Sequence, residues 1–261
     1  MDILETFTPY DLPDDAIDVR CHALDPQHIE ALKLYLASAL PECYITRQDL
    51  KCRAEETGLN IPEILTNKLP DRGSVMSGDF GEIVTLFFLN SECKAQTVPI
   101  KKWRYKQDRT KAAPHSDVVI LYRKHNKNKI SKEDFVVCAE AKQKATNSAF
   151  DPIGSAIDGY QKDRNGRLAR TLVWLKEKAI DIEAKDFIDY IKRFTDLTKV
   201  EYSKYFKATA IIDLNLLDDE LTREIDVPEQ NEHFEVIVLG IPNLKQFYET
   251  VFDRCVTECS L

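Results

Sequence analysis

Glu140 and Lys142 stand two residues apart in the stretch EDFVVCAEAKQKA, which runs from residue 133 to residue 145. On a β-strand, residues two apart point to the same face, so this carboxylate and this amine would project side by side. The apolar FVVCA before them is typical of a buried strand. Two interpretations are open: a metal-and-water apparatus for phosphoester hydrolysis, or a charged strand end.

The Glu-x-Lys pattern alone does not decide between them, because it occurs three times. Glu92-Cys93-Lys94 lies at a predicted helix end, and Glu183-Ala184-Lys185 lies in a solvent-type helical pattern. Only Glu140-Ala141-Lys142 follows a buried strand. This context favours a catalytic role for Glu140-Ala141-Lys142 and not for the other two matches.

A second carboxylate is predicted to lie beside Glu140. Asp117 begins the apolar run DVVIL. If a Lys-rich hairpin at 123–132 joins this strand to the next, residues 118–122 pair antiparallel with 135–139 and bring Asp117 next to Glu140. Glu82, on a predicted helix over 78–90, is a fourth group that can point to the same edge.

Two adjacent carboxylates repel each other unless a cation lies between them. A hard divalent ion such as Mg²⁺ (or Mn²⁺) takes carboxylate, carbonyl and water oxygens and leaves room for a substrate phosphate. Asp117 and Glu140 are therefore the candidate metal ligands. Lys142 is the candidate group that orients water or offsets developing charge.

The elements that must position these residues predict an α/β fold. Residues 1–70 form a mainly helical N-terminal region, irregular over 1–25, with Thr46 and Gly58 as caps of one helix. Residues 71–261 form a second domain, which carries the candidate site. Its predicted elements are a helix at 78–90, strands at 95–103, 116–123 and 134–142, a helical stretch at 153–206, strands at 207–214 and 234–241, and a helix at 243–256.

These motifs, SGDFGEIVTLFFL, SDVVIL and VCAEAKQKA, resemble the PD-(D/E)xK nuclease superfamily and, more narrowly, the HamA family of the bacterial Hachiman anti-phage system. The resemblance implies a restriction-endonuclease-like core with a mixed central sheet flanked by helices. It implies that Asp117 and Glu140 bind the metal, that Lys142 is the catalytic lysine and that Glu82 is the helix acid. One departure is that Ser116, not proline, precedes Asp117.

The resemblance also implies a metal-dependent DNA nuclease that acts as the effector of a helicase–nuclease defence complex, with a HamB-like superfamily 2 helicase as partner. A catalytically inactive helicase-binding regulatory subunit is one alternative. A stand-alone restriction-type endonuclease is another, but the net charge of −8 disfavours it. Gln161 matches the helical glutamine that some related nucleases place beside the site, and His115 is a further auxiliary candidate.

Charge is unevenly distributed along the chain. The band KKWRYKQDRTK interleaves aromatic and basic side chains, a pattern suited to stacking on bases and neutralising phosphates. The candidate nucleic-acid contacts are therefore Lys101, Lys102, Trp103, Arg104 and Lys106; a solvated strand edge is the alternative. Residues 213–235 hold nine acids against Arg223, which fits a solvated loop, a docking surface for a basic partner or a nucleic-acid mimic.

Several classes of protein are disfavoured. The chain has no GxSxG, no HExxH, no phosphate-binding glycine loop and no CxxC among its seven cysteines. No apolar run approaches the ~18–20 residues of a membrane span, and the acidic N-terminus lacks the features of a signal peptide. We therefore expect a cytoplasmic protein without membrane contact.

Overall fold

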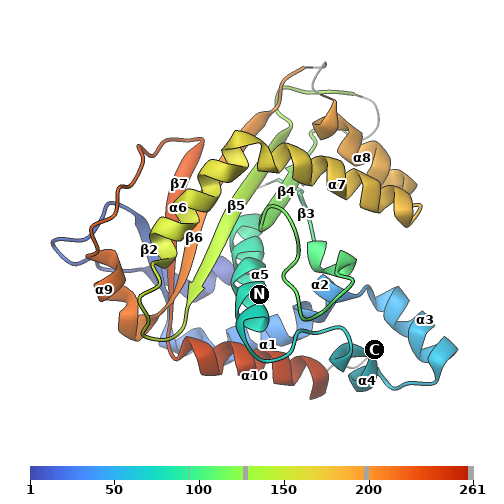
Figure 1. Cartoon of the computed structure of the whole chain (residues 1–261), viewed down its shortest axis with the longest axis horizontal. Helices are drawn as coiled ribbons and strands as arrows, with labels where there is room; N and C mark the ends of the chain where they lie inside the picture. The colour runs from blue at the N-terminus through green and yellow to red at the C-terminus, as the bar shows by residue number, and fades with distance from the viewer. Residues whose placement is uncertain (94, 126–128, 197–199, 258–261) are drawn as a thin grey trace.

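The computed structural model describes residues 1–93, 95–125, 129–196 and 200–257 (Figure 1). Lys94 and the centre of the predicted 123–132 hairpin lie outside the described residues. The strands are β1 (Phe7–Pro9), β2 (Arg20–Leu24), β3 (Val98–Pro99), β4 (Val118–Tyr122), β5 (Phe135–Lys144), β6 (Ser203–Asp213) and β7 (Phe234–Ile241).

The α-helices are α1 (Ile29–Ala39), α2 (Pro41–Tyr44), α3 (Arg47–Thr57), α4 (Ile61–Thr66), α5 (Ser74–Glu92), α6 (Pro152–Lys162), α7 (Leu168–Asp181), α8 (Lys185–Thr195), α9 (Leu217–Leu221) and α10 (Leu244–Thr257). Four 3₁₀ turns are η1 (Ile3–Thr6), η2 (Pro26–His28), η3 (Lys102–Tyr105) and η5 (Leu214–Leu216). A kinked segment, η4 (Asp163–Arg167), joins α6 to α7, and its residues Asn165 and Gly166 are not helical.

The seven strands form one mixed sheet in the order β1-β2-β7-β6-β5-β4-β3. The strands from β2 through β7 and β6 to β5 run parallel, and the pairs at both margins are antiparallel. Helices cover both faces, because the central strands are apolar on both sides. The α/β class with a mixed sheet flanked by helices is confirmed.

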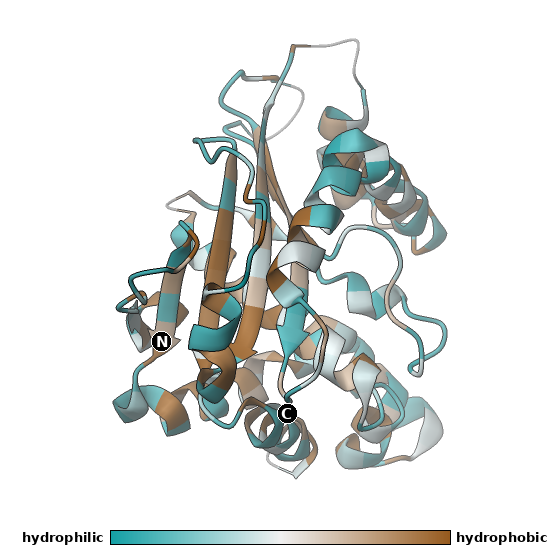
Figure 2. Cartoon of the chain, turned by 60° about the vertical axis from the view of Figure 1, so that its left-hand side comes forward, coloured by the Kyte–Doolittle hydropathy of each residue, from teal (hydrophilic) through white to brown (hydrophobic). Residues whose placement is uncertain are grey.

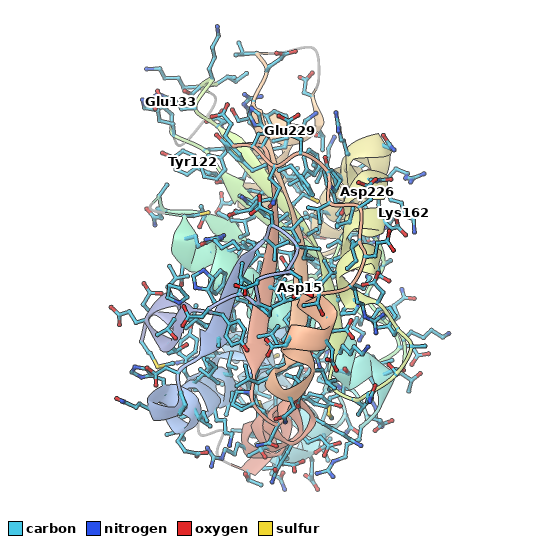
Figure 3. All side chains as sticks on the ribbon, turned by 90° about the vertical axis from the view of Figure 1, so that its left-hand side faces the viewer. Asp15, Tyr122, Glu133, Lys162, Asp226 and Glu229 are labelled. Atoms are coloured by element: carbon cyan, nitrogen blue, oxygen red, sulfur yellow. The ribbon has the colours of Figure 1, made fainter. Side chains whose placement is uncertain are left out.

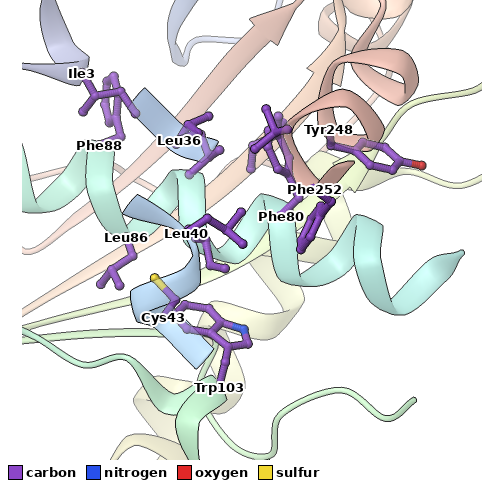
Figure 4. Close-up of a cluster of buried hydrophobic side chains, with 14 of the residues drawn as sticks. Ile3, Leu36, Leu40, Cys43, Phe80, Leu86, Phe88, Trp103, Tyr248 and Phe252 are labelled. Carbon is purple, nitrogen blue, oxygen red and sulfur yellow. The ribbon is translucent and has the colours of Figure 1, made fainter. Parts of the chain in front are cut away.

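Two helical layers cover the sheet. One layer contains α1, α5 and α10, whose apolar side chains pack with Val137, Ala139 and Ile237. The other contains α6, α7, α8 and α9, which pack on the alternate residues of the same strands. Figure 2 shows the hydrophobic colour concentrated on the strands between these layers. Figure 4 shows part of the first layer, where Phe80 of α5 lies near Tyr248 and Phe252 of α10.

The local predictions around the site are confirmed. Residues 118–122 pair antiparallel with 135–139, residue for residue, from Val118↔Ala139 to Tyr122↔Phe135. The predicted helix over 78–90 lies within α5. In α3, the Thr46 side chain accepts a hydrogen bond from the Asp49 amide, and Gly58 ends the helix with a φ of 70°.

Two local predictions were wrong. Residues 1–25 are not irregular, because β1 and β2 lie within them and β2 pairs with β7. The strand predicted over 95–103 is reduced to Val98–Pro99. Proline has no amide hydrogen to extend a ladder, and the next residues turn into η3, which buries Lys102 and Trp103.

The N-terminal region is joined to the rest of the molecule by a common core. Ile3, Leu36 and Leu40 belong to the same buried cluster as Phe80 and Phe252 (Figure 4). The helices α1, α3 and α4 are present as predicted, and α2 is an additional short helix. With β1 and β2 these helices complete the sheet and its covering layer. Residues 1–70 therefore pack as a part of this fold.

The acidic segments meet at one side of the sheet. The Ile17 amide donates to the Leu221 carbonyl, and the Gln230 side chain donates to the Asp18 carbonyl. Figure 3, which looks at this side, shows Asp15, Asp226 and Glu229 there. The stretch 213–235 is partly helical at α9, whose Glu220 is buried. No helix among the described residues is both long enough and apolar enough to cross a membrane.

Candidate active site

The pairing of β4 with β5 brings the two predicted carboxylates together. Asp117 precedes β4 directly, and its Oδ2 accepts a hydrogen bond from the Ala141 amide at 3.1 Å. Glu140 lies on β5 beside it and is 5% exposed. Burial and the charge of Asp117 raise the pKa of Glu140, as expected for carboxylates held together away from water.

Lys142 lies between these carboxylates. Its Nζ is 2.5 Å from Glu140 Oε1, 3.5 Å from Asp117 Oδ2 and 3.4 Å from the Ala141 carbonyl oxygen. Burial lowers the pKa of the amine, but Asp117 and Glu140 outweigh this effect and hold it above its ordinary value. Two carboxylate oxygens and one carbonyl oxygen thus converge on one cation.

Arg167 is the second cation at Glu140, and the sequence did not reveal it. Its Nη2 lies 2.5 Å from Glu140 Oε2 and donates to the Gly159 carbonyl at 2.8 Å. It comes from η4, where Gly166 takes a φ of 113° that glycine adopts readily. The only sequence signal was the i, i+4 spacing of Asp163 and Arg167 around a glycine.

A buried polar network fixes Arg167 behind the site. Asp163 accepts from Arg167 at 2.7 and 2.9 Å and from the Ser116 hydroxyl at 2.6 Å. The Ser116 amide in turn donates to Thr171 Oγ1 of α7 at 3.1 Å. Asp163 thus holds Ser116, which directly precedes Asp117, and also Arg167, which contacts Glu140. Ser116 therefore has a structural role of its own, at the position before Asp117 where the resemblance leads one to expect proline.

Glu82 is linked to Asp117 by Lys102, whose amine contacts both carboxylates. The Lys102 Nζ lies 3.2 Å from Glu82 Oε2, 3.7 Å from Asp117 Oδ1 and 3.0 Å from the Ser116 carbonyl oxygen. Trp103 Nε1 also donates to Glu82 Oε2 at 3.1 Å. Burial raises the pKa of Glu82 well above its ordinary value. For Asp117, burial raises the pKa, but Lys102 and then Lys142 outweigh it and hold the value low.

Comparison with protein families identifies the chain. The family model described as HamA matches residues 1–255. The chain belongs to the HamA family. No curated protein matches it. Membership supports a role in anti-phage defence of the Hachiman type, within a system that has further components.

The basic band of this HamA-family chain lies largely inside the fold, and most of its cations are paired with acidic side chains. Trp103 is 2% exposed, so it cannot stack on a base in this conformation, and Lys102 is 3% exposed and paired with carboxylates. Lys101 pairs with Glu42 at 3.2 Å, and Lys106 pairs with the buried Asp79 at 2.8 Å. Arg104 donates to the Glu42 carbonyl oxygen. The polypeptide turns this band inward because it links α5 to β4 across the site.

The two auxiliary candidates lie outside the cluster. His115 adopts a φ of 72°, and its ring lies 5.0 Å from that of Trp174. Burial, and then Lys102 and two arginines, lower its pKa. Gln161 is exposed on α6, and the described residues show no hydrogen bond from it to the carboxylates. Its neighbour Gly159, by contrast, lies directly against Glu140.

The donor set of this HamA-family site suits a hard divalent cation. Asp117, Glu140 and the Ala141 carbonyl supply oxygens that already converge on the Lys142 ammonium, and Mg²⁺ prefers such oxygens. Within the described residues, no group of three His, Cys, Asp or Glu side chains is arranged to hold a metal. Two carboxylates and one carbonyl are therefore the protein ligands that this site can offer.

Proposed function

We propose that this HamA-family chain is a metal-dependent DNA nuclease with a PD-(D/E)xK site, and that it serves as the effector of a Hachiman defence complex. The observation that supports this most is the convergence of Asp117 Oδ2, Glu140 Oε1 and the Ala141 carbonyl oxygen on one cationic centre. The order of helix acid, strand acid and Glu-x-Lys along α5, β4 and β5 supports the superfamily assignment.

The proposed roles follow from the contacts. Asp117, Glu140 and the Ala141 carbonyl hold Mg²⁺ or Mn²⁺, which supplies Lewis-acid polarisation of the scissile phosphate and a more acidic water. Arg167 holds Glu140 in place through a charge-assisted hydrogen bond. Lys142 orients the attacking water or offsets charge that develops on phosphate oxygens. Glu82 keeps Lys102 against Asp117.

The partner proposed for this chain is a superfamily 2 helicase of the HamB kind. Family membership supports it, because HamA belongs to a defence system with further components. The absence of a phosphate-cradling glycine loop also means that nucleotide hydrolysis must come from another chain. The acidic side formed by 11–18 and 222–233 is a surface on which a basic partner can dock.

A catalytically inactive, helicase-binding role is the second candidate. The observation that favours it is that Lys142, Arg167 and Lys102 already neutralise the two carboxylates. Such a cluster is electrostatically satisfied without a metal ion. The two candidates differ in their response to Lys142→Ala, which removes nuclease action but leaves a docking role unchanged.

Plasmid degradation with Mg²⁺ tests the proposal. We expect the purified chain, alone or with its helicase and ATP, to nick or degrade plasmid DNA. The double variant Glu140→Ala with Lys142→Ala, and EDTA, should each abolish this. If the wild type stays silent in both settings while helicase binding persists, the regulatory role is correct and the nuclease proposal is wrong.

A further inference from the structure

A basic cavity is lined on one side by Trp103. It has a volume of about 300 Å³ and lies between η3 with its following loop, α2 and the end of α4. Four cations line it, namely Lys68, Arg104, Lys106 and Arg109, against Asp108 as the sole acid of its wall. The lining of this cavity is therefore basic, although the whole chain has a net charge of −8.

Two of the four cations have carboxylate partners of their own. Lys106 pairs with the buried Asp79 at 2.8 Å, and Arg109 pairs with Asp71. The acid of the wall is also satisfied locally, since Asp108 accepts from the amide and the hydroxyl of Thr110. These hydrogen bonds hold the pKa of Asp108 at about 2, so it is ionised at neutral pH, and its Oδ2 pairs with Lys111 at 3.3 Å.

Lys68 and Arg104 have no carboxylate partner in the described part of the chain. Arg104 donates from Nε and Nη2 to one backbone oxygen, that of Glu42, at 2.8 and 2.5 Å. Burial, together with Arg53, lowers the pKa of Lys68. A half-buried cation without a counter-charge is costly. An anion in the cavity would offset that cost at both residues.

The cavity is coupled to the site by direct contacts. Trp103 lines its wall and donates to Glu82 Oε2. Glu82 pairs with Lys102, and Lys102 lies 3.7 Å from Asp117 Oδ1. A group seated against Lys68 and Arg104 is thus one aromatic side chain away from the residues around Asp117.

We propose that this cavity binds a phosphate of the nucleic-acid strand that is being cut, with Lys68 and Arg104 as its ligands. The inference rests on the proposed nuclease function and names a strand contact for the same site. Arginine and lysine are the usual phosphate ligands, and each such contact adds to affinity without reading sequence. The strand would pass along the face of η3 before its scissile phosphate reaches Asp117 and Glu140.

Binding is measured separately from cleavage, on a chain that carries Lys142→Ala. The probe is a fluorescein-labelled single-stranded oligonucleotide, followed by anisotropy at several salt concentrations. Lys68→Gln and Arg104→Gln should each weaken binding about tenfold, equally for unrelated sequences, and lower the salt slope by about one. The matched controls are Lys192→Gln on α8 and Arg223→Gln after α9, which should bind like the parent.

The outcomes separate the cavity from the nuclease proposal. Unchanged affinity in both cavity variants, with unchanged melting temperatures, overturns the strand contact even if the wild type cuts DNA. If adenosine monophosphate binds the parent and loses affinity in the variants while oligonucleotide binding does not change, the phosphate belongs to a free nucleotide and the proposal is also overturned. Because Lys68 holds no other group by ion pair, its variant tests the cavity even if Arg104→Gln unfolds.

Discussion

At the scale of single residues, the site depends on how closely Glu140 is enclosed. Its carboxylate has a cation on each oxygen, Lys142 on Oε1 and Arg167 on Oε2, and Gly159 of α6 lies against its side chain. No side chain at position 159 would leave room for the carboxylate. The glycine is therefore part of the site although it carries no chemistry.

Gly159→Ala tests this enclosure. The new Cβ would overlap the Cγ, Cδ and Oε1 of Glu140, so the carboxylate must move. We expect cleavage to fall at least about a hundredfold and stability to fall by about 1–3 kcal/mol.

The control for Gly159→Ala is Gly78→Ala, which lies in α5 with open space around its Cβ. It should gain about 0.5–1 kcal/mol in thermal or urea unfolding and cut DNA like the wild type. Full activity in Gly159→Ala would show that Glu140 does not need its present position.

At the scale of elements, η4 decides where Arg167 points. Gly166 has the positive φ at the kink between α6 and α7. This kink places Arg167 beside Glu140. Gly166→Ala meets no atom within 4 Å, so its cost is that of the backbone alone, about 1–2 kcal/mol. We expect this cost together with reduced cleavage, because the segment would relax and shift Arg167.

Gly58→Ala is the matched control for Gly166→Ala. It also changes a positive-φ glycine with open space around it, at the end of α3. It should lose stability to a similar degree in urea titrations and keep full activity. Equal activity in both variants would mean that the position of Arg167 does not depend on the kink.

A second element-scale feature is the buried ion pair that fastens α8 to the start of β5. Arg193 Nε donates to Asp134 Oδ2 at 2.6 Å, and both side chains are almost fully buried. Burial raises the pKa of Asp134, but Arg193 and the amides of Ser131 and Lys124 outweigh this and hold it below its ordinary value. Its contribution to stability is therefore present above about pH 4 and is lost as pH falls through the depressed pKa.

Asp134→Asn should cost about 3–5 kcal/mol at neutral pH, because it leaves Arg193 buried without a counter-charge. The difference from wild type should shrink below about pH 4, as urea titrations at several pH values would show. Asp189→Asn, on the exposed face of α8, removes a carboxylate that pairs with Lys192 and should change little. A pH-independent difference would contradict the ionised pair.

At the scale of the whole molecule, the sheet joins the two ends of the chain. Phe7 and Leu24 lie in one core with Ile237, Val251 and Phe252. A chain of residues 71–261 alone would expose the margin of β7 and the part of this core that packs against residues 1–70. We expect it to show no cooperative thermal transition by circular dichroism and to aggregate. A sharp transition would instead show that residues 1–70 are an independent addition.

The sequence was sufficient for the carboxylate pair, because strand alternation and equal strand lengths determine the β4–β5 register. It was not sufficient for Arg167 or Gly159, which reach Glu140 only through the packing of α6 and η4 on the sheet. The burial of Lys102 and Trp103 in the basic band was not predicted, for a related reason. Its composition suited nucleic acid, but the inward turn at η3 depends on Glu82 and Asp79, which are distant in sequence.

The order of the sheet also has a consequence for how the protein is made. The ribosome produces β2 early, but its partner β7 comes more than two hundred residues later along the chain. Until β7 has emerged, the N-terminal strands have no partner to complete the sheet, and such long-range pairing is slow to form. The finished fold is therefore reached only after β7 has been made. For a protein proposed to cleave DNA, this means that an incomplete chain without β7 lacks the complete sheet and should be inactive.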